Sequence, residues 1–153
     1  MLFRSYNAYG DKEAIFLRAF DQYAEQFLES AAHALAEGDV AARLRNFFDM
    51  IIVNMTSGSP SRGCLTTRTA LDVAISSTAV RQRVQGLLGR LEQLITKAIS
   101  SAPGRLPAID ADRLARVIVT FTRGLAVMER AGYSRKQLKE SAATFIDALL
   151  GKA

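Results

Sequence analysis

Apolar residues recur along this chain at the three-to-four-residue spacing of an α-helix, and no segment shows the alternation of a half-buried strand. The first amphipathic stretch starts at Asp11, with acidic residues that suit the positive end of a helix dipole, and Gly38 marks its end. A second stretch runs from Val40 to Met55 with an apolar stripe wide enough to face a core. Both stretches are predicted to be helices.

The segment 56–63 is dense in residues that favour turns, and it is the clearest loop in the chain. We expect a short helix from about Cys64 to Ala74 after it. A longer helix follows, which Thr78 can cap and which Pro103-Gly104 ends.

Two further helices complete the pattern. One lies between Asp110 and Ala131, and the other opens with the capping box Ser134 to Gln137 and runs to about Leu150. A short turn joins them, so they should pack as an antiparallel pair. The sequence therefore predicts an all-α bundle of about six helices.

The helix between Asp110 and Ala131 is apolar on two sides, and the second side is built from smaller residues. A helix of this kind has its own core to contact and something else besides. We therefore expect homodimerisation through the last two helices. The residues expected at the dimer interface are Val119, Thr122, Ala126, Ile146 and Leu150.

The composition fits one ordinary domain, because 49% of the 153 residues are hydrophobic and 23% are charged. The chain has no apolar run long enough to cross a membrane, and its first residues lack the features of a secretory signal. These observations predict a cytoplasmic protein without a membrane partner.

The net charge of +5 does not indicate a nucleic-acid surface. Residues 1–40 carry three positive groups and seven negative ones, and the basic excess elsewhere is diffuse. No cluster of lysine and arginine interleaved with aromatic residues is present.

The residue pattern indicates neither a catalytic site nor a metal site. The single histidine, His33, and the single cysteine, Cys64, form no metal-ligand cluster, and His33 has no partners for nucleophilic catalysis nearby. Asp110 and Asp112 precede an apolar helix, where capping is their natural role. We therefore expect no enzyme, no metal and no cofactor.

For two residues the sequence leaves two interpretations open. Cys64 is either a small packed hydrophobe or, near a helix N-terminus, a reactive thiol. Arg68 is either a solvated residue at the edge of its helix or a cation for an acidic ligand or a second subunit.

The aromatic and methionine residues of the interior either fill the core or line a small-molecule pocket, because both roles use the same periodic positions. The candidate lining residues are Phe20, Tyr23, Phe27, Phe48, Ile52, Met55, Thr67, Leu71, Phe121 and Leu125.

Two segments resemble tetracycline-repressor-like (TetR family) transcriptional regulators. The segment from Tyr6 to Phe16 has tyrosine, an aromatic residue three positions later and then Lys-Glu, as in the connection between the recognition helix and the first core helix of that family. The segment from Ser59 to Leu65 is similar to a loop and helix start of one large branch.

The resemblance implies an all-helical domain that dimerises through its last two helices and binds a small apolar or aromatic effector. Effector binding would move the first long helix and change the spacing of two DNA-reading heads. Tyr6 and Lys12 match positions that contact DNA phosphates in such repressors.

The chain departs from the family at its start, where a helix-turn-helix head needs some 40–50 residues. Residues 1–10 correspond to a remnant of the recognition helix and linker, and 11–153 to the ligand-sensing and dimerisation domain. Operator binding is expected only if the missing head is restored. The alternative is a stand-alone headless helical dimer that binds a ligand or a protein.

Overall fold

The computed structural model describes residues 3–72, 77–104 and 110–151, and for residues 3–11 it describes the backbone alone. Every regular element in these residues is an α-helix, which confirms the predicted all-α bundle. The helices are α1 (Phe3–Ala34), α2 (Val40–Thr56), α3 (Leu65–Asp72), α4 (Thr78–Ser100), α5 (Ala111–Arg130) and α6 (Arg135–Leu149).

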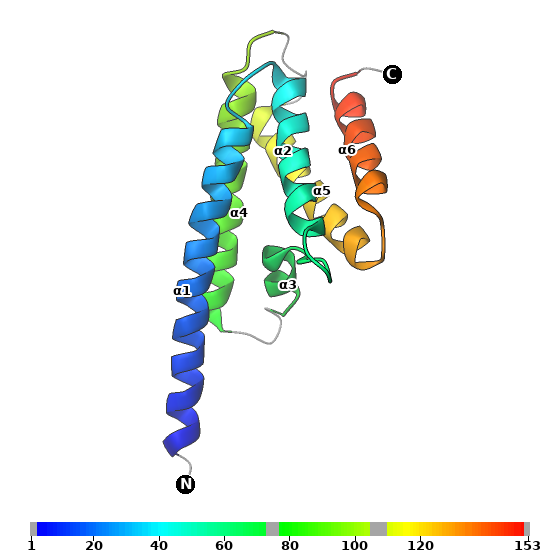
Figure 1. Ribbon diagram of the computed structural model, residues 1–153. Helices are drawn as coiled ribbons and strands as arrows, with labels where there is room; N and C mark the ends of the chain where they lie inside the picture. The colour runs from blue at the N-terminus through cyan, green and yellow to red at the C-terminus, as the bar shows by residue number, and fades with distance from the viewer. Residues whose placement is uncertain (1–2, 73–76, 105–109, 152–153) are drawn as a thin grey trace.

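Helix α1 runs alongside α4, and its N-terminal end projects beyond the rest of the bundle (Figure 1). It begins eight residues before the predicted start at Asp11, because the segment has no proline and Gly10 alone costs only about 1 kcal/mol within a helix. Gly38 lies in the turn after α1 with φ +94°. A Cβ there would lie 2.7 Å from that of Ala42, so this turn requires glycine.

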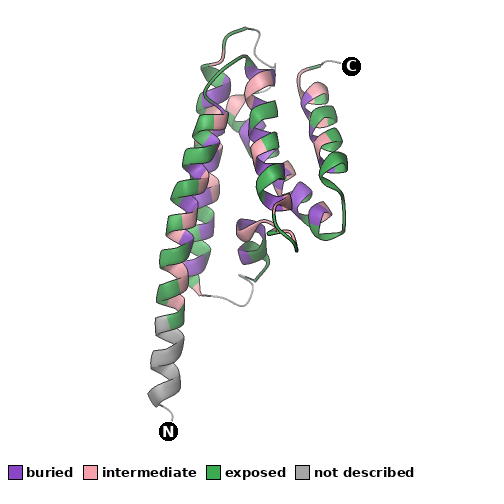
Figure 2. Cartoon of the chain, in the orientation of Figure 1, coloured by how far each residue is buried: buried purple, intermediate pink, exposed green. Residues whose placement is uncertain are grey.

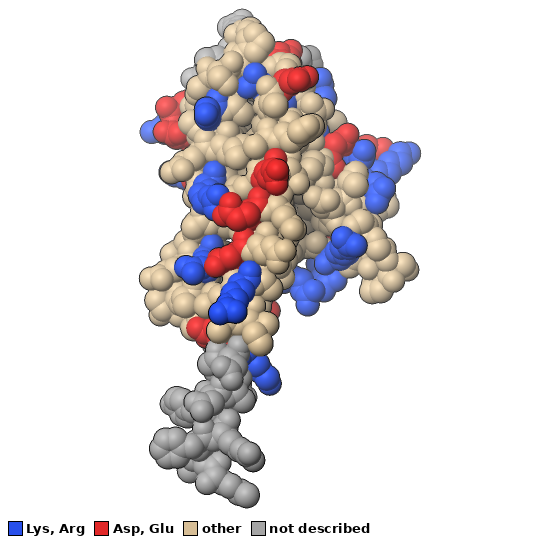
Figure 3. Space-filling model, turned by 60° about the vertical axis from the view of Figure 1, so that its left-hand side comes forward, with Lys and Arg blue, Asp and Glu red and all other residues tan. Residues whose placement is uncertain are grey.

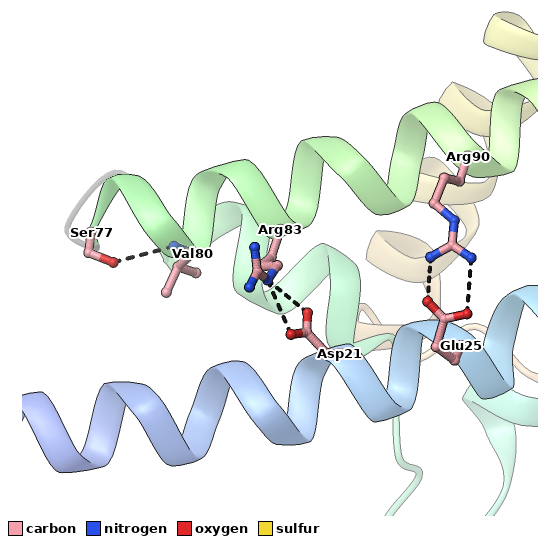
Figure 4. Close-up of polar contacts among 6 residues, drawn as sticks. All are labelled: Asp21, Glu25, Ser77, Val80, Arg83 and Arg90. Atoms are coloured by element: carbon pink, nitrogen blue, oxygen red, sulfur yellow. Dashed lines mark hydrogen bonds and ion pairs between the residues drawn. The ribbon is translucent and has the colours of Figure 1, made fainter.

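The helix caps follow the sequence closely. Asp110 accepts hydrogen bonds from two amides of the first turn of α5, and Ser134 and Gln137 form the predicted capping box of α6. At α4 the cap is Ser77, one residue before the predicted Thr78, because Ser77 is the last residue with an extended backbone (Figure 4). The predicted end of the short helix, Ala74, lies outside the described residues.

Helix α5 is enclosed by its own chain, since it contacts α2, α3, α4 and α6. The side chains of α5 that face these helices are therefore buried, as the colouring of Figure 2 indicates for the inner faces of the bundle. The residues buried on α5 are Leu114, Ala115, Ile118, Val119, Thr122, Leu125, Ala126 and Glu129.

This enclosure buries four of the five residues expected at a dimer interface within the single chain. Val119, Thr122, Ala126 and Ile146 are each at most 4% exposed within the single chain, so they present no surface to a second one. Leu150 is half-buried. The second apolar side of α5 serves the protomer's own core. Its outer side carries Val117, Phe121, Gly124 and Met128, which are exposed or half-buried.

The loop between α2 and α3 is anchored to the last turn of α5. The Ser61 hydroxyl donates a hydrogen bond to Oε1 of Glu129, a carboxylate only 7% exposed. Gly63 passes close to the other oxygen, and a Cβ there would lie 3.5 Å from Oε2. The loop is therefore fixed to α5 before the chain enters α3.

We predict that Ser61→Ala lowers the free energy of unfolding by about 1–3 kcal/mol, because it leaves a buried carboxylate oxygen without its donor. Urea denaturation followed by circular dichroism measures the change. Ser59→Ala, in an exposed position of the same loop, is the matched control and should stay within about 0.5 kcal/mol of the parent. Equal losses for the two variants would contradict the anchoring role.

A second prediction separates two residues that the sequence placed in one pocket. Phe48 is 1% exposed and packs edge-on against Phe121 and Phe145, whereas Leu71 is 71% exposed. Phe48→Ala should cost about 3–5 kcal/mol of stability, and Leu71→Ala less than about 0.5 kcal/mol. Chemical denaturation at one fixed protein concentration compares them. A small loss for Phe48→Ala would show that this position is not core.

Candidate functional site

A cavity of about 380 Å³ opens between α1, α2, the start of α3 and α5. Its walls combine aromatic, aliphatic and polar side chains, the mixture typical of small-molecule sites. The lining residues are Tyr23, Gln26, Phe27, Ser30, Ile51, Asn54, Met55, Arg62, Gly63, Cys64, Leu65 and Arg123.

Helix α1 supplies an aromatic wall. Tyr23 and Phe27 are one turn apart and their rings stack, with centroids 5.9 Å apart and an interplanar angle of 16°. The Tyr23 hydroxyl lies 3.5 Å from Thr66 Oγ1 of α3. Burial raises the pKa of the Tyr23 phenol above its ordinary value, against the smaller opposing effects of Thr66 and Arg123. Tyr23 is therefore a neutral hydroxyl at neutral pH.

Helix α5 contributes a half-buried arginine to the cavity lining. The Arg123 guanidinium donates to Thr122 Oγ1 from Nε and Nη2, at 3.2 and 3.0 Å. Its Nη1 donates to Cys64 Sγ and to Thr67 Oγ1, both at 3.4 Å. None of these acceptors is a carboxylate, so the contacts orient the cation without pairing it with an acidic side chain.

The cavity is positively charged. Arg62 and Arg123 line it and no acidic residue does. Within the described residues, no carboxylate lies within 4 Å of the side-chain nitrogens of either arginine. Gln26, Ser30, Asn54 and Arg62 are exposed and form its open edge. The arrangement can hold a small molecule that is apolar in one part and negatively charged in another.

Of the ten residues that the sequence suggested for a pocket, Tyr23, Phe27 and Met55 line this cavity. Phe20, Phe48, Ile52 and Leu125 are core residues, each at most 3% exposed. Thr67 is buried behind the cavity and accepts from Arg123. The other two lie elsewhere: Phe121 stacks on Phe145 of α6, with centroids 3.9 Å apart, and Leu71 faces solvent on α3.

The polar lining residues were missed, because exposed positions of a helix look alike in sequence. Arg123 did carry a signal, since it is a charged residue flanked on the same side of its helix by Val119, Thr122 and Ala126. Cys64 lines the cavity and is half-buried, whereas Arg68 is exposed on α3 and does not line it.

The described residues hold no group of three metal-ligating side chains. None of the helices described is both long and apolar enough to span a membrane. For the two positions related to DNA contact, Lys12 is exposed on α1 and the Tyr6 side chain lies outside the described residues.

Two ion pairs join α1 to α4, on a face where acidic and basic side chains intermix on the surface (Figure 3). Arg83 Nε lies 2.8 Å from an Asp21 oxygen, and Arg90 forms a two-fold contact with Glu25 (Figure 4). The hydrogen bond from Arg90 is the largest cause of a Glu25 pKa below its ordinary value. Exposed pairs of this kind contribute little stability, so they align the helices without locking them.

The same fold occurs in solved regulators. The structure of a TetR transcriptional regulator from Chloroflexus aurantiacus J-10-FL superimposes with a TM-score of 0.78 at 24% identity, covering 96% of this chain and 76% of that one. The reduced form of NemR from E. coli superimposes with a TM-score of 0.73 at 17% identity, covering 92% of this chain and 72% of that one. At these identities the likeness shows the fold alone.

Sequence comparison with curated proteins found no match. A sequence profile described as "Tetracyclin repressor-like, C-terminal domain" matches residues 40–145, which make up more than half of the chain. The resemblance inferred from the residue pattern is thereby confirmed. The chain belongs to the tetracyclin repressor-like C-terminal domain family.

Proposed function

We propose that this chain is the effector-sensing and dimerising part of a TetR-like transcriptional regulator, working in the cytoplasm by binding and not by catalysis. The observation that carries the proposal is that the cavity shares a wall with α1, the helix whose N-terminal end projects from the bundle (Figure 1). A small molecule in the cavity would contact Tyr23, Gln26, Phe27 and Ser30 of that helix.

The geometry of α1 suits it to act as a lever. Tyr23 lies twenty residues from the first residue of the helix, which corresponds to about 30 Å at the rise of an α-helix. A tilt of about 5° at the cavity would move that end by roughly 3 Å. The weak ion pairs to α4 would guide such a tilt without preventing it.

In this proposal the N-terminal end of α1 leads to a DNA-reading head, as in the family. Tyr6 and Lys12 would contact DNA phosphates and position the domain without reading bases. Two heads, one per subunit, would read two half-sites whose spacing depends on the tilt of α1.

The dimer would form on the outer side of α5 and α6. Val117, Phe121, Gly124 and Met128 recur at spacings of four, three and four and make one partly apolar stripe along α5. Next to it the half-buried Phe145 of α6 stacks on Phe121. Such a stripe, beside another helix, is suited to a four-helix contact between two copies.

Gln26→Trp tests the cavity as the effector site, because Gln26 lines its open edge and an indole there would obstruct entry. We expect compounds found by a thermal-shift screen of small aromatic and aliphatic molecules to bind this variant at least about 10-fold more weakly. Titrations followed by NMR measure the affinities. Gln22→Trp, one turn away and outside the cavity, is the control and should bind like the parent. Equal affinities for both variants would place the site elsewhere.

Val117→Lys tests the dimer. We expect the parent chain to be dimeric by light scattering at about 10 μM. Val117, 48% exposed, would place a charge in the interface, so this variant should dissociate at least about 10-fold more readily. Val53→Lys, at 43% exposure on α2, is the matched control and should remain dimeric. A monomeric parent chain would refute the dimer.

A further inference from the structure

We propose that the cavity takes a small organic carboxylate, with the anionic end on Arg123 and the apolar part against the rings of Tyr23 and Phe27. This inference rests on the proposed role of the cavity as effector site and specifies the chemical class of the ligand. It differs from the small apolar or aromatic effector that the sequence suggested, because it requires a charge.

Arg123 supplies the positive charge of the cavity wall. Its guanidinium is half-buried there, and its hydrogen bonds go to Thr122, Thr67 and Cys64, none of which is a carboxylate. A charge that leaves bulk water without a counter-charge is costly, and a bound anion removes that cost. The planar guanidinium fork donates charge-assisted hydrogen bonds to anions such as carboxylates, and Nη2 keeps one N–H beyond its contact with Thr122.

Thr122 fixes the direction of this fork. Its hydroxyl is fully buried and donates to the Val119 carbonyl at 2.6 Å, so toward Arg123 it can act only as an acceptor. It receives hydrogen bonds from both Nε and Nη2. The guanidinium is therefore held in place before any ligand arrives, which lowers the entropy lost on binding.

The surrounding charges favour an anion. Arg62 supplies a second positive group at the open edge. The Glu129 carboxylate lies behind Gly63 and does not line the cavity, and one of its oxygens accepts a hydrogen bond from Ser61. Tyr23 adds no negative charge, because a phenol is protonated at neutral pH and burial raises the pKa of this one further.

The remaining walls of the cavity determine the apolar part of the ligand and its size. The stacked rings of Tyr23 and Phe27 and the side chains of Ile51, Met55 and Leu65 present an apolar surface. The volume of about 380 Å³ is at the small end of ligand sites. A monocarboxylate with one ring or a short aliphatic chain meets both conditions.

Matched acid and amide probes test the inference on the whole chain. Benzoate, phenylacetate, 3-phenylpropanoate and butyrate are titrated against the parent protein by NMR, each beside its primary amide. We expect at least one acid to shift cavity resonances and to bind about 10-fold or more tightly than its amide, because only the acid forms charge-assisted hydrogen bonds. The difference in affinity between the acid and its amide should become smaller at high salt.

Three variants test whether Arg123 causes the preference for an acid over its amide. Arg123→Met should reduce it to less than about 2-fold, and Arg123→Lys should retain part of it, because lysine keeps the charge but loses the fork. Arg68→Met removes an exposed arginine outside the cavity and should change nothing. The comparison of acid and amide on the parent protein stands even if Arg123→Met does not fold.

Two results would overturn the carboxylate inference, and they have different consequences for the proposed effector site. If an acid and its amide bind the cavity equally, the carboxylate class is wrong and the effector site remains. If no probe of either series shifts a cavity resonance up to about 10 mM, the carboxylate class is wrong, and the Gln26→Trp comparison alone then decides the role of the cavity.

Discussion

The enclosure of α5 by four helices of its own chain determines where everything else can lie. The side chains of an α-helix are distributed around its axis, and on α5 those that point inward are buried in the core. Among the positions left over are Arg123, which lines the cavity, and the outer stripe of Val117, Phe121, Gly124 and Met128. In the proposed function, ligand binding and self-association therefore use positions that the core leaves free.

The sequence predicted the secondary structure well, because its signals are local. Helix periodicity, the cap at Asp110 and the box at Ser134 and Gln137 each depend on residues within one or two turns. The start of α1 was misplaced, since a weak helix breaker such as Gly10 and a true helix boundary look alike in a local residue pattern.

The site was predictable only in part, because it depends on which helices meet. Tyr23, Phe27 and Met55 were found through apolar spacing, but Phe20 and Phe48 share the same spacing and belong to the core. Periodicity shows that α5 has two apolar sides and does not show that the side with Val119, Thr122 and Ala126 is covered within one chain. Of the polar residues that line the cavity, the exposed ones, Gln26, Ser30, Asn54 and Arg62, have no periodic signal in the sequence.

The cavity and the outer stripe meet on adjacent residues. Arg123 lies in the cavity wall and Gly124, the next residue, lies on the outer side of the same helix. Their Cα atoms are separated by one trans peptide, about 3.8 Å. If both proposals hold, a ligand and a second subunit are sensed on either side of a single peptide unit, so communication between them needs no relay through the core.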